Sequence, residues 1–292
     1  PCTADAIGVV YDTHTGDLVW YQLMQAGGTF GAVDMLSFTE DKTVLGETRG
    51  DVIEVDLMGA DLLRLDDLST TFGVTAGGLF GNFHHDIMKR NDLYYVIYQE
   101  NFGGGGFSQN VLDNVIIFDG TGTQVAEWRS ADHLAIPTNW SGDFMHTNTV
   151  FVDAAGDIYL SFLNQTALIK LDGDWTSANF GTPLWVLSGN GNDPFGVAFP
   201  IDWSAVGSPS AFGGQHSLSI HDDGRVQVLD NNNGRGLVMS LDEVAGTATV
   251  EGEYSTHENR CLAPQGTSRS TAAGNPVVGC GGDWVREFDV GT

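Results

Sequence analysis

The chain has 292 residues, with 12 Lys and Arg against 38 Asp and Glu, so its formal net charge is −26. Such a charge would repel a phosphate backbone or an anionic lipid surface, which argues against a nucleic-acid-binding or membrane-docking protein. Hydrophobic residues make up 41% of the chain, enough to bury a core and to exclude a disordered protein. No apolar run reaches the length of about 18 residues that a membrane span requires, so we predict none.

The first predicted element is a hairpin over residues 6–22, AIGVVYDTHTGDLVWYQ, with Asp12 at the end of its first strand. Each of the segments that follow starts with a short strand, turns through acidic residues and glycine, and continues into an apolar strand. Helical periodicity is nearly absent. The five segments begin at Asp34, His85, His146, His216 and Gly266.

The third strand of most segments ends in Asp, a residue that accepts hydrogen bonds from the backbone of a turn. These strands read VIEVD, VIIFD, LIKLD, LVMSLD and VREFD. The segment starts are 51, 61, 70 and 50 residues apart, the period of a four-stranded propeller blade with loop insertions. A β-sandwich is the main alternative, but it does not predict this repeated phrase.

We therefore predict an all-β protein in which residues 1–292 form a single β-propeller domain of four-stranded blades. Five blade starts are visible, and six blades are favoured. The sixth would either close the ring by pairing N- and C-terminal strands, which removes free sheet edges, or lie within residues 173–212.

Two further features concern structural cross-links. Cys261 and Cys280 bracket a short segment and are predicted to form a disulfide, since few basic and many acidic residues indicate an exported protein; buried thiols are the alternative. Closing a loop of about 20 residues would contribute about 3 kcal/mol. Oxygen-rich turns are candidates for a structural Ca²⁺, with ordinary β-turns as the alternative. They are Asp222-Asp223-Gly224, Asp230-Asn231-Asn232-Asn233-Gly234 and Asn190-Gly191-Asn192-Asp193.

Histidines recur near the first strand of three segments, at His84 or His85, at His146 and at His216. Innermost propeller strands line a central channel, so equivalent residues on different blades converge near its axis. Imidazoles placed there could bind a metal ion or act as nucleophile and acid or base. The alternative is that they satisfy backbone groups at strand ends or fill the channel.

Four phrases resemble the arylsulfate sulfotransferases and their relatives. They are FHHDI (residues 83–87), MHTNTV (residues 145–150), GDIYLSFLNQTALIKLD (residues 156–172) and GGQHSLSI (residues 213–220). The tail QGTSRSTAAGNPVVGCGGDWVREFD is similar to the last blade of that family. The resemblance covers residues 80–290 well and residues 7–60 more loosely.

The resemblance implies a six-bladed propeller exported to the periplasm or cell surface, which moves a sulfuryl group from a phenolic sulfate to a phenol. The family works through a sulfohistidine and needs no nucleotide sulfate donor, so no cofactor is required. His216 would be the nucleophile. His146 and His85, with His84 as the register alternative, would hold sulfate oxygens or transfer protons, and Asn148 of the HxN motif is a candidate substrate-binding residue.

One position departs from the family pattern. The family has an S-x-R stretch after the HxN blade, whereas this chain reads Ser161-Phe162-Leu163, with leucine where the arginine is expected. Arg269 is a candidate substitute for binding sulfate; a packing or surface salt bridge is its alternative role. Three hypotheses follow: an active sulfotransferase, a non-catalytic propeller that binds a ligand or a protein partner at the cell surface, and a metal-binding propeller that uses the histidines.

Overall fold

The computed structural model describes residues 6–12, 15–24, 35–48, 50–75, 82–102, 110–137, 139–191, 193, 195–207, 210–255, 265–271, 273–280 and 284–289. They belong to two compact units. The first unit comprises residues 1–132 and 138–144, and the second comprises residues 133–137 and 145–292. The prediction of a single domain over the whole chain stays a prediction.

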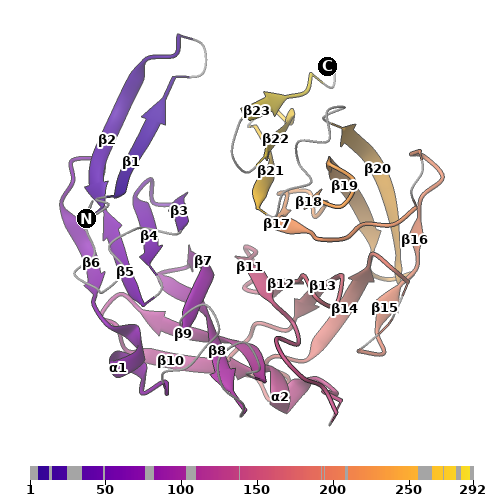
Figure 1. Cartoon of the computed structure of the whole chain (residues 1–292), viewed down its shortest axis with the longest axis horizontal. Coiled ribbons are helices and arrows are strands. Elements are labelled where there is room, and N and C mark those ends of the chain that lie inside the picture. Colours follow the sequence, from indigo (N-terminus) through magenta and orange to yellow (C-terminus); the bar gives the residue numbers. More distant parts are fainter. Residues whose placement is uncertain are drawn as a thin grey trace. The chain divides into compact units, whose positions relative to one another are not determined.

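The first unit contains three antiparallel sheets (Figure 1). A hairpin pairs β1 (Ala6–Tyr11) with β2 (Leu18–Met24). The next sheet has the order β3 (Met35–Phe38), β4 (Val44–Thr48), β5 (Asp51–Val55) and β6 (Asp61–Leu65), and is followed by α1 (Leu68–Phe72). The third has the order β7 (Phe83–Arg90), β8 (Leu93–Asn101), β9 (Val111–Asp119) and β10 (Gln124–Arg129), after which α2 (Ser130–His133) begins.

The second unit contains three more sheets. The first runs β11 (Thr147–Val152), β12 (Ile158–Phe162), β13 (Ala167–Leu171), β14 (Pro183–Ser188), with β15 (Ala198–Phe199) added in parallel. The next runs β17 (His216–Ile220), β18 (Val226–Asp230), β19 (Arg235–Asp242), β20 (Thr247–Ser255), with β16 (Ile201–Asp202) added in parallel. The last consists of β21 (Gly266–Ser270), β22 (Pro276–Cys280) and β23 (Trp284–Glu287).

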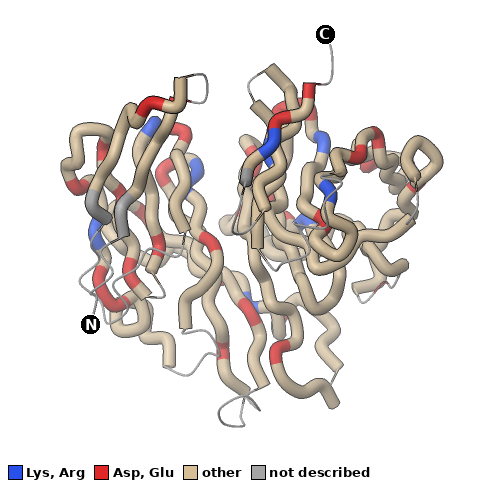
Figure 2. Tube along the Cα trace, turned by 45° about the horizontal axis from the view of Figure 1, so that its top comes forward, with Lys and Arg blue, Asp and Glu red and all other residues tan. Residues whose placement is uncertain are grey.

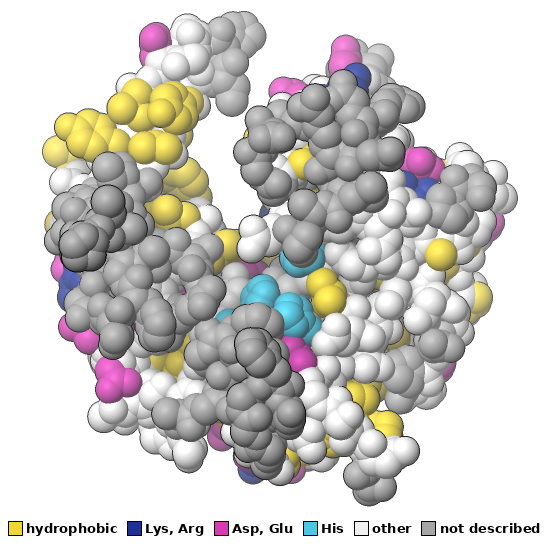
Figure 3. Space-filling model, in the orientation of Figure 1, with side chains coloured by type: hydrophobic (Ala, Val, Ile, Leu, Met, Phe, Trp, Pro, Cys, Tyr) yellow, Lys and Arg dark blue, Asp and Glu magenta, His cyan; other side chains and the backbone are white. Residues whose placement is uncertain are grey.

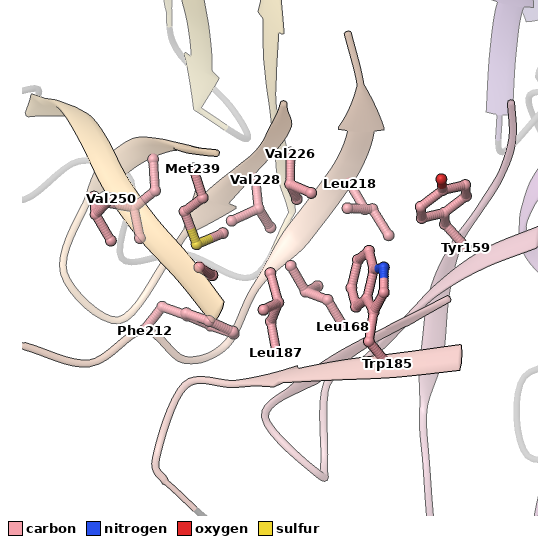
Figure 4. Close-up of a cluster of buried hydrophobic side chains, with 12 residues drawn as sticks. Tyr159, Leu168, Trp185, Leu187, Phe212, Leu218, Val226, Val228, Met239 and Val250 are labelled. Atoms are coloured by element: carbon pink, nitrogen blue, oxygen red, sulfur yellow. The ribbon is translucent and has the colours of Figure 1, made fainter. Parts of the chain in front are cut away.

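Neighbouring sheets within each unit pack face to face, so their middle strands are buried on both sides and read as continuous apolar runs. In the second unit, side chains from the β11–β15 and β16–β20 sheets interlock in one cluster that includes Trp185, Leu187, Leu218 and Val228 (Figure 4). In the first unit, Phe83, Tyr94 and Phe118 belong to the equivalent cluster. Fully burying each such side chain contributes about 1.5–3 kcal/mol, and this packing holds the first strands β7 and β17 in place.

The predicted strand pattern is confirmed in its coarse form. The five predicted starts coincide with β3, β7, β11, β17 and β21, each the edge strand of its own sheet, so five sheets of the propeller-blade type follow one another. The Asp residues at strand ends accept hydrogen bonds from the following turn, as expected. Asp119 Oδ1, for example, accepts from the backbone N–H groups of Thr121 and Thr123.

The count of six blades and the closure of a ring are not confirmed. The N-terminal hairpin forms a two-stranded sheet of β1 and β2, as predicted. The described residues of 173–212 do not form a separate blade; they supply β14, β15 and β16 to the two sheets on either side.

The cysteine and calcium predictions have different outcomes. Cys280 is disulfide-bonded, but Cys261 lies outside the described residues, so their pairing stays a prediction. The oxygen-rich turns use their carboxylates internally: Asp230 binds Arg235, Asp223 binds Arg225, and Asp193 accepts from four backbone N–H groups. Such contacts are those of ordinary turns, and they give the calcium prediction no support.

Acidic residues outnumber basic ones along both units (Figure 2). Most basic residues are held in contacts within the fold. Lys89 pairs with Asp41 and Glu54, and Lys170 pairs with Asp157 and Glu243. No helix among the described residues has the length and hydropathy to cross a membrane.

Candidate functional site

A left-handed backbone residue occurs at the histidine motif of three sheets, within the first strand in β7 and β17 and directly before it in β11. The φ angles are 65° at His85, 51° at His146 and 60° at Ser217. The strand ladder shifts register at or beside each of them. A left-handed residue other than glycine costs on the order of 1–3 kcal/mol, and such bulges re-aim side chains near functional sites. The same strained backbone conformation therefore recurs in three blades.

This backbone marker corrects the predicted alignment of the histidines. His85 and His146 occupy corresponding positions, equivalent to Ser217. His216 lies one residue earlier in its strand, at the position of His84. The earlier residue is buried, with His84 2% and His216 8% exposed, whereas the left-handed residue is half-buried in all three motifs. The histidines are thus of two structural kinds.

His216 has a defined tautomer. Its Nδ1 lies 2.9 Å from the carbonyl oxygen of Gly214 and 2.9 Å from Oδ1 of Asn231. The amide of Asn231 is oriented by its Nδ2, which donates to the carbonyl oxygen of Gln265 at 2.9 Å. Both partners of Nδ1 are acceptors, so Nδ1 carries the proton. In the neutral ring, Nε2 is then the nitrogen with the free lone pair.

The loop before His216 has its shape because two glycines approach Asn232 closely. A Cβ on Gly213 would lie 2.5 Å from Nδ2 of Asn232, and one on Gly214, which has φ +57°, would lie 2.6 Å from its Oδ1. The buried ion pair between Arg235 and Asp230, at 2.9 Å, supports the adjoining turn. These contacts bring the carbonyl of Gly214 and the amide of Asn231 onto His216.

The surroundings of His216 favour its neutral form. Burial is the largest influence and lowers the pKa of His216 below its ordinary value. Hydrogen bonds to Asn231 and Gly214 act in the opposite direction and raise this pKa, while the charge of His146 lowers it. A buried neutral imidazole with Nδ1 protonated presents Nε2 as a nucleophile near neutral pH.

The HxN motif lies beside the His216 loop in the second unit. Asn148 donates from Nδ2 to the carbonyl oxygen of Gln215 at 2.6 Å, and Nε2 of Gln215 in turn donates to the carbonyl oxygen of Phe162 at 2.8 Å. The backbone N–H of Leu163 donates to the carbonyl oxygen of His146 at 3.3 Å. Leucine thus stands next to a candidate catalytic histidine, at the place where the family resemblance expects arginine.

Arg269 reaches the same region from β21. Its Nη1 donates to the carbonyl oxygen and Oγ of Ser217, both at 2.6 Å, and to the carbonyl oxygen of Leu218 at 3.2 Å. The guanidinium therefore fastens the bulge that follows His216. This places the predicted substrate-binding residue near the candidate nucleophile, with part of its donor capacity used by backbone carbonyls.

The first unit has a separate histidine centre on β7. Nδ1 of His84 lies 2.5 Å from Nδ1 of His85, and the two rings meet edge to face with centroids 4.7 Å apart. Nε2 of His84 lies 3.2 Å from Oδ1 of Asp113, on β9. Asp113 and His84 are almost fully buried, at 1% and 2% exposure, while His85 is half-buried. Histidine side chains also reach the molecular surface (Figure 3, cyan).

Among the residues that the structure describes, no group of three or more His, Cys, Asp and Glu side chains could hold a metal ion. The metal-binding hypothesis thus has no support from these residues.

Asn231 and Asp113 were not singled out as site residues by the sequence. Asn231 lies in one of the oxygen-rich turns that are calcium candidates in the sequence. Asp113 interrupts the apolar run of β9, VLDNVIIFD, whose residues 111–118 are all buried. A carboxylate inside such a strand requires a partner, and this pattern is the sequence signal that marks Asp113.

Successive blade-type sheets with a buried, tautomer-fixed histidine on a first strand define a propeller-like protein with a candidate histidine nucleophile. The chain belongs to the arylsulfotransferase (ASST) family, whose model matches residues 3–259. The match includes all four candidate histidines and Asn148, whereas Arg269 and β21–β23 lie beyond it. No curated protein matches the chain.

Several solved structures share the fold at low sequence identity. A protein of unknown function from Bacteroides caccae has 10% identity and a TM-score of 0.54, over 96% of this chain and 85% of that one. A streptogramin B lyase has 7% identity and a TM-score of 0.53, over 97% and 76%. A periplasmic gluconolactonase from Pseudomonas aeruginosa has 12% identity and a TM-score of 0.50, over 92% and 68%. At these identities the likeness concerns the fold alone.

Proposed function

We propose that this protein is an exported arylsulfotransferase that transfers a sulfuryl group between phenolic compounds through His216. Membership of the family supports the reaction class. The observation that carries the choice of nucleophile is the pair of acceptors on Nδ1 of His216, which leaves the Nε2 lone pair free for attack. Export to the periplasm or cell surface, and a six-bladed ring closed by terminal strands, belong to the same proposal.

The reaction has two balanced halves. Nε2 of His216 attacks the sulfur of an aryl sulfate, an N–S bond forms, and the S–O bond to the ring breaks. Its electron pair stays on the phenolate oxygen, which takes up a proton. In the second half the oxygen of an acceptor phenol attacks sulfur while its proton is removed. The N–S bond then breaks, and its electron pair returns to Nε2.

The other predicted residues have supporting roles in this proposal. His146 and His85, with His84 behind it, would hold sulfuryl oxygens or transfer the protons of the two halves. Asn148 contributes through its bond to the backbone of Gln215, which shapes the nucleophile loop. Arg269 would contribute positive charge next to that loop.

A second candidate function is favoured by Leu163. Leucine offers no hydrogen-bond donor to a sulfate oxygen, whereas an arginine fork binds such oxygens in a bidentate manner. Most described basic residues are bound within the fold, to carboxylates or, for Arg269, to backbone carbonyls. The alternative is therefore a propeller that keeps the histidine geometry and binds a phenolic ligand or a protein partner at the cell surface without turnover. The basic residues that form ion pairs with carboxylates are Arg64, Lys89, Arg90, Arg129, Lys170, Arg225 and Arg235.

One experiment separates the two functions. The protein is incubated with 4-nitrophenyl sulfate and a phenol acceptor, and peptides are searched by mass spectrometry for a sulfo group on His216. Release of 4-nitrophenol with the adduct on His216 is expected, and His216→Gln should abolish both. His221→Gln is the matched control, because His221 lies in the turn after the same strand and bonds to Gln227. Absence of both adduct and release in the wild type would overturn catalysis and leave the binding function.

A further inference from the structure

The two histidines of β7 are brought together by backbone strain. Successive side chains of a strand point to opposite faces of a sheet, so adjacent residues 84 and 85 would not normally meet. The left-handed φ of 65° at His85 breaks this alternation, and the rings contact each other. Backbone strain of this kind persists only where the surrounding structure enforces it, and it clusters at functional sites.

The hydrogen bonds along this chain have a direction set by the carboxylate. Asp113 is an acceptor when ionised, so Nε2 of His84 carries the proton that it donates to Oδ1. In the neutral ring, Nδ1 of His84 is then an acceptor. It faces Nδ1 of His85, which must donate. This order leaves the lone pair of His85 on Nε2, at the less buried end of the chain.

Asp113 places a buried carboxylate within β9. A buried carboxylate is costly unless it is paired and hydrogen-bonded. On the neighbouring strand β8, the register partner of Asp113 is the uncharged Gln99. The pairing with His84 gives this buried charge a partner, and that pairing is also what orients the imidazole.

We propose that Asp113 is a positioning residue, which acts through His84 to fix the tautomer and orientation of His85. The inference rests on the proposed function for the role of His85 in proton transfer, but its geometry stands independently. When Nε2 of His85 accepts a proton, the ring becomes positively charged. The negative charge of Asp113 stabilises that positive charge through His84. This arrangement of carboxylate, imidazole and acting group is the general way in which a histidine is held in one tautomer.

Nitrogen NMR of the wild-type protein tests the geometry, and variants are needed only to assign its signals. The chain has only 8 histidines, so ¹⁵N-histidine labelling with His84→Gln and His85→Gln for assignment resolves each ring. We expect a proton on Nε2 of His84 and a proton on Nδ1 of His85. An unprotonated Nε2 on His84 would overturn the proposal.

Asp113→Asn tests the consequence for catalysis. The change removes the charge and keeps the size of the side chain. We expect the His85 nitrogen signals to shift to a mixture of tautomers and kcat to fall about 10- to 100-fold, with KM for the aryl sulfate little changed. Asp51→Asn is the matched control, since Asp51 is a buried carboxylate in the same unit that accepts from Thr48 and the backbone of Asp67.

The outcomes are distinct. An Asp113→Asn protein with unchanged His85 nitrogen signals contradicts the proposal, as does an equal fall in kcat in Asp51→Asn. A wild-type protein that shows both expected protons but forms no sulfo-adduct disproves the proposed function and leaves the role of Asp113 in place.

Discussion

His216 and the His84–His85 pair are both histidine centres on the first strand of a sheet, yet different groups form hydrogen bonds with their ring nitrogens. An amide oxygen of Asn231 and a backbone carbonyl hold Nδ1 of His216, whereas a buried carboxylate, Asp113, holds Nε2 of His84. A neutral acceptor fixes a tautomer and favours the imidazolium less than a carboxylate does, so that burial can keep His216 neutral, which suits a nucleophile. A carboxylate also compensates a positive charge, which suits a group that accepts and returns protons.

Among the substitutions that leave His216 in place, the largest expected effect comes from removing the guanidinium contacts to the bulge that follows it. Arg269→Ala leaves the carbonyls of Ser217 and Leu218 without their guanidinium donor, so we expect sulfuryl transfer to fall by about 10²-fold. Stability should fall by about 2 kcal/mol. Initial rates and urea unfolding measure the two effects. Arg225→Ala, which removes a surface pair with Asp223, should leave the rate unchanged; an equal loss there would show that the effect of the Arg269 contacts is not specific.

The amide behind His216 is tested by a pair of substitutions. Asn231→Asp places a negative charge beside Nδ1 and should raise the pKa of His216, so that the acidic limb of the rate profile moves to higher pH. The rate at neutral pH should fall about tenfold and recover at higher pH. Asn231→Ala loses the acceptor without adding charge, and its loss should persist at every pH. Identical pH profiles for the two variants would refute the assigned role of the amide.

Leu163→Arg restores the donor that the family pattern expects beside His146. If the nucleophile is intact, the added guanidinium should raise kcat/KM for an aryl sulfate about tenfold through its contacts to sulfuryl oxygens. Leu163→Met is the control, because it keeps an apolar side chain of similar volume. A Leu163→Arg protein without any gain would indicate that the leucine is not what limits transfer.

The smallest effect is a contribution of His216 to stability that depends on pH. The pKa of His216 is lowered by burial in the folded state, while an unfolded histidine titrates near about 6.5. As the pH falls below that value, the unfolded state binds a proton first, so the free energy of unfolding decreases until the lowered pKa is reached. Unfolding at pH 7.5 and below should show a steeper decrease in the wild type than in His216→Gln, because the other titrating groups are common to both proteins; parallel curves would contradict it.

Much of the fold is readable from the chain because a blade is a local structure. Its strands are consecutive, its turns need Asp and Gly at set places, and its period recurs, so the starts of β3, β7, β11, β17 and β21 could be predicted. The added strands β15 and β16 could not, because each is only two residues long and pairs in parallel, and β16 pairs with β20, a strand far from it along the chain.

The candidate site likewise has one part that the sequence predicts and another that it does not. Histidines in repeated phrases were visible to sequence reasoning and to the family resemblance. The one-residue offset of His216 was not, because it depends on a left-handed residue that is histidine in two blades and serine in the third. Asn231 and Asp113 lie 15 and 29 residues from the histidines that they contact, and no local pattern links them.

The sequence by itself determined the all-β class, the blade period, the acidic character and the identity of the candidate histidines, because each follows from composition or from short-range spacing. Only the tertiary structure decided which atom of each imidazole is held. That choice depends on hydrogen bonds between different strands and turns, and on burial, which arises only when neighbouring sheets pack together. The contrast between an amide behind His216 and a carboxylate behind His84 is therefore a property of the packed fold.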